Sequence, residues 1–164
     1  MNGNEEILIP DELILNKIYQ FREYQVMLDM DLAELYGVET KQLKRAVRRN
    51  IKRFPSDFLF ELSQNELENL RSQFGTSSWG GLRYPPMAFT EQGIAMLSSI
   101  LNSERAIVVN IRIIRIFVKM RELLLSQKEI IAQLREIAQR VSNHDESIIL
   151  IFDYLKQLEQ DKQQ

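Results

Sequence analysis

Residues 28–54 read LDMDLAELYGVETKQLKRAVRRNIKRF, and this stretch decides how the rest of the chain is interpreted. An apolar-patterned segment comes first, then a glycine, then a second segment rich in lysine and arginine. Gly37 suits the left-handed conformation that ends a helix, so a first helix should stop there. This order predicts a helix-turn-helix, with an inner face of Leu32, Leu35 and Tyr36, an N-cap at Asp29 or Asp31, a corner residue at Val38 and a second N-cap at Thr40.

The positive charge of the chain is concentrated in the second segment. Residues 41–56 carry seven lysines and arginines and no acid, whereas residues 1–40 carry nine acids and two bases. The whole chain has a net charge of −2, so the basic block does not reflect a generally basic composition. Such a block is typical of a solvated helix face, a disordered basic arm or a polyanion-binding surface.

The spacing within the block favours the polyanion-binding surface. In one helix from Lys41 to Phe54, turning by about 100° per residue, Leu43, Val47, Asn50 and Phe54 point inward, flanked by Ala46 and Ile51. The cations line the opposite face, where a solvated helix would normally interleave acids. We therefore expect a recognition helix in the major groove of duplex DNA. Base edges are assigned to Gln42, Arg45 and Arg49, and phosphates to Lys41, Lys44, Arg48, Lys52 and Arg53. A basic surface helix without a nucleic-acid role is the alternative.

Short strands are predicted on both sides of these helices. Residues 14–28 alternate around Arg22 and Glu23 and predict an N-terminal hairpin. FPSDFLFELS (residues 54–63) and LRYPPMAF (residues 82–89) predict two strands of a wing-like hairpin, and the paired prolines suit an edge position. Arg83 is the expected wing contact to the DNA backbone or minor groove, and Arg71 and Trp79 are further candidates. Between and after these strands we expect a helix with a Ser63–Glu66 capping box and a helix capped by Thr90.

A heptad pattern of apolar residues runs from Val109 to Leu158. Beyond Ser126 its composition is that of a coiled coil, which predicts a C-terminal oligomerisation helix over residues 124–164. The predicted seam consists of Ile130, Leu134, Ile137, Val141, Ile148, Ile151, Leu155 and Leu158. Isoleucine at the d-like positions Ile130, Ile137 and Ile151 disfavours a simple parallel dimer relative to higher or antiparallel states, which leaves the oligomer number open. The alternative is an amphipathic hairpin that breaks near Ser142–Asn143 and folds back on its own domain.

Parallel self-association would join two DNA-reading units, and two-fold symmetry then favours a palindromic site with half-sites about one helical turn apart.

The fold expected overall is α+β and mostly α: a DNA-binding domain over residues 10–123, followed by the C-terminal helix. His144 falls in the heptad seam, where it is either a polar register contact or a tolerated residue at a frayed point.

Composition excludes several classes of protein. The chain has no cysteine and one histidine, so disulfide frameworks, thiolate metal sites and multi-histidine sites are excluded. Asp29, Asp31 and Glu34 could hold a divalent metal in a nuclease, but acids at a helix N-terminus also complement the helix dipole. No catalytic residue, cofactor or metal is expected. Residues 106–120 contain too many polar side chains to span a membrane, and the first residues lack a signal-peptide pattern, so a cytoplasmic protein is expected.

Three ordered strings carry a resemblance to a known family. They are VMLDMDLAELYGVETKQLKRAVRRNIKRFPSDFLFELS (residues 26–63), LRSQFGTS (70–77) and RYPPMAFTEQGIAMLSSILNSERAIVVNIRIIRIFVKMREL (83–123). The chain resembles the phage-type KilA-N superfamily, most closely its ORF-six-N (open-reading-frame-six N-terminal) domain group. The resemblance covers approximately residues 10 to 123.

This resemblance implies a DNA-binding domain of phage, prophage and bacterial chromosomes, associated with antirepressor-like and regulatory proteins and similar to winged-helix binders. It implies no catalytic residues, and of the functional positions only the basic helix at Lys41 to Arg53 carries over. Residues 124–164 depart from antirepressors that append a second recognisable domain. The expected partners are double-stranded DNA and further copies of the chain, and a regulatory protein of phage or host is left open. The competing interpretation is a protein-interaction module that acts through its coiled coil.

Overall fold

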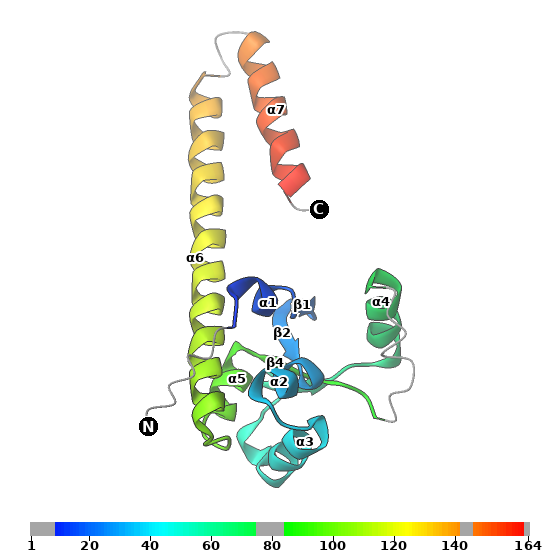
Figure 1. The fold of residues 1–164 in the computed structure, drawn as a ribbon. Coiled ribbons are helices and arrows are strands. Elements are labelled where there is room, and N and C mark those ends of the chain that lie inside the picture. Colours follow the sequence, from blue (N-terminus) through cyan, green and yellow to red (C-terminus); the bar gives the residue numbers. More distant parts are fainter. Residues whose placement is uncertain (1–8, 75–83, 142–145, 163–164) are drawn as a thin grey trace. The chain divides into compact units, whose positions relative to one another are not determined.

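The computed structural model describes residues 9–74, 84–141 and 146–162. The chain divides into two compact units, Met1–Phe117 and Val118–Gln164, with the boundary inside one long helix. The described elements, drawn in Figure 1, are α1 (Asp11–Leu15), β1 (Ile18–Phe21), β2 (Tyr24–Leu28), α2 (Asp29–Tyr36), α3 (Thr40–Arg49), a 3-10 turn (Ile51–Arg53), β3 (Leu59–Glu61), α4 (Gln64–Phe74), β4 (Met87–Thr90), α5 (Glu91–Leu97), α6 (Glu104–Val141) and α7 (Glu146–Lys162). The fold is α+β and mostly α, as the sequence predicts.

A small antiparallel sheet lies at the centre of the first unit, with the strand order β1-β2-β4-β3. The predicted N-terminal hairpin is confirmed, because β1 and β2 pair around Arg22 and Glu23. Both of these residues have positive φ, 52° and 68°, as the two-residue hairpin turn that matches strand twist requires. Pairing of β2 with β4 then connects this hairpin to the chain segment that follows α4.

The prediction of an edge strand at residues 82–89 is wrong. β4 lies between β2 and β3, and all four of its residues are buried. Pro85 and Pro86 precede β4, so neither removes a hydrogen-bond donor from the ladder. The two strands predicted for the wing do pair with each other, as β3 and β4, but β4 also pairs with β2. Both strands therefore belong to the central sheet of the unit and do not form a separate wing.

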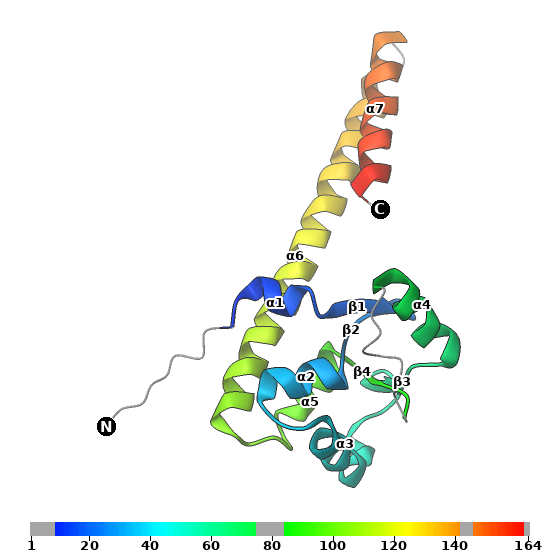
Figure 2. The ribbon, with the colours of Figure 1, turned by 45° about the vertical axis from the view of Figure 1, so that its right-hand side comes forward.

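Side chains of successive strand residues point to opposite faces of this sheet, and both faces are packed. On one face, Val26, Leu28 and Ala88 pack with Leu67 and Leu70 of α4. On the other face, the Phe89 ring meets the Phe54 ring edge to face at 6.0 Å. Figure 2 shows α4 apart from α2, α3 and α5.

The helix starts at Ser63 and Thr90 agree with the sequence. Glu66 N donates to Ser63 Oγ at 3.2 Å and Ser63 N donates to Glu66 Oε1 at 2.9 Å, which confirms the capping box. Arg22 hydrogen-bonds the same carboxylate and, together with the Ser63 bonds, holds the pKa of Glu66 below its ordinary value despite burial. Thr90 Oγ1 accepts from Gly93 N and caps α5.

A buried polar chain ties α2 to the first part of α6. The Tyr36 hydroxyl donates to Asn110 Oδ1, and Asn110 Nδ2 donates to Ser98 Oγ at 2.8 Å. Tyr36 and Asn110 are each only 2% exposed, and burial holds the pKa of the Tyr36 hydroxyl above its ordinary value. Because buried polar groups are costly without partners, this chain fixes α2 against α6 in one register.

The second unit contains two helices, which corrects the single C-terminal helix predicted for residues 124–164. α6 ends at Val141 and α7 begins at Glu146, so the two helices are separated where the hairpin alternative expects a break. Ser142, Asn143 and His144 lie outside the described residues. Arg135 of α6 pairs with Glu159 of α7 at 2.7 Å, which shows that α7 folds back along α6. The heptad pattern continues through the break because both helices need an apolar stripe to pack on each other.

Gly93 packs so closely against the backbone that we expect its replacement by alanine to destabilise the fold. A Cβ atom there would lie 2.0 Å from the Phe58 carbonyl oxygen, which accepts the Thr90 N–H. We expect Gly93→Ala to lower the free energy of unfolding by about 3 kcal/mol, despite the gain in helix propensity of about 1 kcal/mol. Thermal unfolding measures this, with the neighbouring exposed Gln92→Ala as the control. Equal melting temperatures for the two variants would contradict the packing argument.

Candidate nucleic-acid interface

The turn between α2 and α3 has the geometry that the sequence predicts. Gly37 has φ 71°, and Val38 N donates to Ala33 O at 3.0 Å, which closes the end of α2. Arg105 Nε of α6 donates to Leu35 O at 2.9 Å and braces the same turn. A Cβ atom on Gly37 would lie 3.3 Å from Arg105 Nε, so both conformation and space favour glycine.

The predicted N-caps of α2 and α3 are wrong. Asp29 and Thr40 are the first residues of their helices, and the preceding Leu28 and Glu39 make no side-chain cap hydrogen bond. Asp29 Oδ1 instead accepts from the adjacent Met30 N at 2.7 Å. The other carboxylate oxygen, Oδ2, makes contacts outside α2.

The inward face of α3 is confirmed, but the helix is shorter than predicted. Leu43 and Val47 are fully buried, and Phe54 is 6% exposed. α3 ends at Arg49, where Asn50 Nδ2 donates back to Ala46 O at 2.8 Å, and residues 51–53 form a 3-10 turn. Because the helix stops there, Ile51 is 52% exposed, where an α-helix through Phe54 would carry it toward the inner face.

Lys44 lies against the protein and differs in this from the other cations of the block. Its Nζ lies 3.3 Å from Asp29 Oδ2, and it donates to Pro85 O at 3.3 Å. The Lys44 side chain is 13% exposed and the Asp29 side chain is fully buried. Asp29 Oδ2 also accepts from Met87 N at 3.1 Å, so one carboxylate joins the starts of α2 and β4 to the middle of α3. Lys44 therefore has a structural role, in place of the predicted phosphate contact.

The remaining cations form an exposed surface, which we call the basic ridge. Its members are Lys41, Arg45, Arg48 and Arg49 on α3, and Lys52 and Arg53 on the 3-10 turn. In the part of the chain that the structure describes, none of the six is within ion-pair distance of an acidic side chain. Gln42 is exposed on the same helix. The mutual repulsion of these charges is therefore not relieved by acids of the described chain.

Tyr84 is a neighbour of the ridge that the sequence pattern does not reveal. Its ring lies 5.8 Å from the Arg48 guanidinium carbon and 5.9 Å from Lys44 Nζ, at the distance of cation–π contacts. The Tyr84 side chain is 55% exposed. It is 36 positions from Arg48 in the chain, so only the tertiary fold brings the two together.

Three further side chains, Arg83, Trp79 and Arg71, are predicted from the sequence to contact DNA. Arg83 and Trp79 lie outside the described residues, so the structure places neither. Arg71 is half-buried on α4, which covers the opposite face of the sheet from Phe54 and Phe89. The structure therefore does not bring Arg71 together with the basic ridge.

The three acids considered for a metal site are bound by lysines. Asp29 pairs with Lys44, while Lys17 Nζ lies 3.4 Å from Asp31 Oδ1 and 3.1 Å from Glu34 Oε2. Burial raises the pKa of Asp31, and Asp31 and Glu34 together hold the pKa of Lys17 above its ordinary value against the effect of burial. Within residues 9–74, 84–141 and 146–162, no group of three metal-ligating side chains gathers, and no helix is long and apolar enough to cross a membrane.

We expect Asp29→Asn to destabilise the first unit, because it leaves the Lys44 charge largely buried without its partner. The expected loss is about 2–4 kcal/mol in the free energy of unfolding. Adding Lys44→Met to Asp29→Asn should recover part of this loss, since the unpaired cation is then removed. Urea unfolding of the single and double variants measures the coupling.

Glu34→Gln is the matched control, because it removes a carboxylate from the same helix in an ion pair whose acid is 73% exposed. We expect this control to lose less than about 1 kcal/mol. A loss from Asp29→Asn no larger than that of the control would show that the Asp29–Lys44 pair does not hold α3 in place.

The comparisons with known proteins agree with the resemblance seen in the sequence. The family model described as the ORF6N domain matches residues 16–100, which contain the sheet, α2, α3 and the whole basic ridge. No curated protein and no solved structure matches the chain. Since the family match covers more than half of its length, the chain belongs to the ORF6N domain family.

Proposed function

We propose that this protein is a non-enzymatic DNA-binding regulator of the phage type, in which α2 and α3 act as a helix-turn-helix. Membership of the ORF6N family supports a phage-type regulatory and DNA-binding role. An antirepressor-like activity is one form that such regulation takes in the KilA-N superfamily that the chain resembles. The proposal assigns no operator and no sign of regulation.

The observation that carries this proposal is the basic ridge. Six exposed cations lie on α3 and the turn that follows it, with no acid of the described chain to neutralise them. A duplex carries one phosphate charge per roughly 1.7 Å of its axis and would relieve their repulsion. The opposite face of α3 is fixed by buried Leu43 and Val47, so the ridge is held outward on a rigid element.

The side chains of the ridge have different proposed roles. Gln42, Arg45 and Arg49 would read base edges in the major groove, because glutamine and arginine make bidentate contacts with bases. The phosphate contacts are assigned to Lys41, Arg48, Lys52 and Arg53. Tyr84 beneath Arg48 would orient that guanidinium toward the backbone through its cation–π contact. Arg83 stays a predicted contact outside the described residues.

We expect the affinity for duplex DNA to fall steeply with salt. If two subunits each neutralise about four phosphates, the slope of log K against log salt is roughly −7, and one subunit alone gives about half of that. Charge reversal in Arg45→Glu/Arg48→Glu should weaken binding at least about 100-fold without loss of helical content. Fluorescence anisotropy with a random-sequence duplex measures the affinity, and circular dichroism measures the helical content.

The matched control is Arg115→Glu/Lys119→Glu, which makes the same change in net charge at two exposed positions of α6. It should weaken binding less than about 10-fold, because only the long-range field of the protein changes. Equal losses from both pairs would mean that net charge and not the ridge governs binding. Loss of helical content in the Arg45/Arg48 variant alone would assign these residues a structural role.

A further inference from the structure

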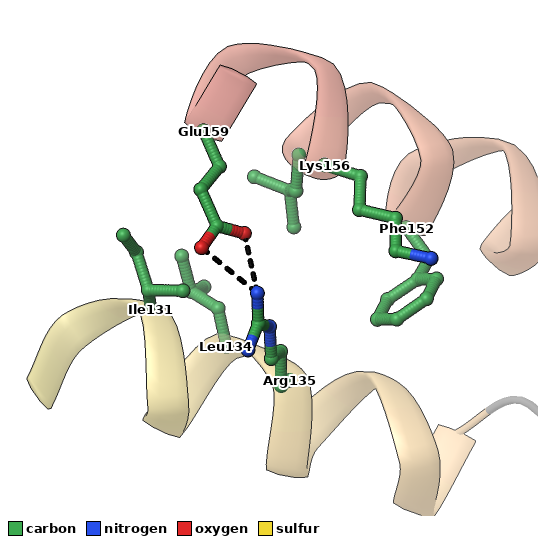
Figure 3. Close-up of a pocket in the computed structure, with 7 residues that line it drawn as sticks. Ile131, Leu134, Arg135, Phe152, Lys156 and Glu159 are labelled. Carbon is green, nitrogen blue, oxygen red and sulfur yellow. Dashed lines mark hydrogen bonds and ion pairs between the residues drawn. The ribbon is translucent and has the colours of Figure 1, made fainter. Parts of the chain in front are cut away.

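The second unit is a hairpin of two helices with a well-formed internal contact. Arg135 Nη2 donates to both carboxylate oxygens of Glu159, at 2.8 and 2.7 Å (Figure 3). Between the helices lie Ile131, Leu134, Phe152 and Leu155, around a cavity of about 30 Å³. Such a cavity has room for about one water molecule, so it is no ligand site.

Other apolar side chains of the same hairpin are exposed. Ile130 is 53% and Ile137 57% exposed on α6, and Ile151 is 59% and Leu158 40% exposed on α7. These are four positions of the predicted oligomerisation seam, and the contact between the helices does not cover them. Of the other seam residues, Leu134 and Leu155 line that contact, while the side chains of Val141 and Ile148 lie outside those described.

Helical geometry places the four exposed residues on one side of the hairpin. At about 100° per residue, Ile130 and Ile137 of α6 lie about 100° from the direction of Ile131, which faces α7. Ile151 and Leu158 lie about 100° in the same rotational sense from Phe152, which faces α6. Because the two helices are antiparallel, equal rotations in the same sense lead to the same side. We call this side, formed by Ile130, Ile137, Ile151 and Leu158 with Leu134 and Leu155 between them, the hairpin face.

The two sides of the hairpin differ in chemistry. On the hairpin face, the described positions between Gln127 and Ile137 of α6 are Gln127, Ile130, Gln133, Leu134 and Ile137, and those of α7 up to Leu158 are Ile151, Leu155 and Leu158; none of these is charged. Lys162, at the end of α7, is a charged residue on this side. The opposite side carries Lys128, Ala132 and Glu136 of α6, and Asp153, Gln157 and Gln160 of α7. Depletion of charge beside large apolar side chains is typical of the core of a protein–protein interface.

The size and shape of the hairpin face fit a second hairpin of the same kind. The 17 residues of α7 give a length of about 25 Å, and two adjacent helices give a width of about 20 Å. Pairing two such faces would bury about 500 Å² on each, or about 1,000 Å² in total, which reaches the lower bound for a specific interface. Leu134 and Leu155 line the contact between α6 and α7. Up to Leu158 the face also meets its own copy without like-charge repulsion.

We propose that the hairpin face binds the same face of a second copy of this chain, forming a two-fold symmetric four-helix bundle. In such a bundle, the exposed apolar residues of each hairpin face pack against those of the other copy, and together they form one shared core. This arrangement differs from a coiled coil to which each chain contributes one helix, because each chain supplies two antiparallel helices. The inference does not depend on DNA binding, since every residue that carries it belongs to the second unit.

Sedimentation equilibrium of the full chain tests the proposal. Wild-type protein should have twice the chain mass of 19.3 kDa. Ile130→Glu/Ile151→Glu should raise the dimer dissociation constant at least about 100-fold, because it buries two carboxylates in each copy. Ala132→Glu/Gln157→Glu adds the same charges to the opposite side, at exposed positions, and should remain dimeric.

Helical content by circular dichroism accompanies each measurement. Should the glutamate variant lose its helices, Ile130→Ala/Ile151→Ala decides instead, with an expected rise in the dissociation constant of at least about 10-fold. Wild-type protein that stays monomeric at about 100 μM would overturn the proposal. So would a dimer that the control pair disrupts as much as the hairpin-face pairs, or one that the alanine pair leaves unchanged.

Discussion

The carboxylate of Asp29 is the contact on which the arrangement of the first unit depends most. It is fully buried and binds the Met87 amide at the start of β4 and the Lys44 ammonium in the middle of α3. A buried carboxylate is tolerated only with such partners, so burying Asp29 requires these three elements to meet. One side of α3 is thereby held against the sheet by an ion pair as well as by Leu43 and Val47. The other cations of the block are left on the outside.

That division explains how one helix serves both the fold and the proposed function. Lys44 neutralises an acid of the protein, whereas the basic ridge meets none within the described chain. Arg105 braces the turn before α3, and the polar chain from Tyr36 to Ser98 fixes α2 against α6. Each contact restricts the direction in which α3 can point, and a preorganised cationic surface loses less conformational entropy when it binds a polyanion.

Local features of the fold could be predicted from the sequence because they rest on neighbouring residues. The left-handed end at Gly37, the Ser63–Glu66 capping box and the amphipathic pattern around Leu43 are of this kind. Features that depend on distant partners could not: Asp29 with Lys44, Tyr84 beside Arg48, and β4 between β2 and β3. The seam beyond residue 126 is ambiguous in itself, because the same heptad pattern suits one long coiled coil or a folded-back hairpin.

NMR titration of the labelled protein with a short duplex tests the central claim, that the outward side of α3 is the DNA-binding surface. The account predicts the largest shifts at the side-chain nitrogens of Gln42, Arg45 and Arg49, with little change at Lys44 Nζ, which stays bound to Asp29. Shifts centred on α4 or on the hairpin face, with α3 unchanged, would contradict it.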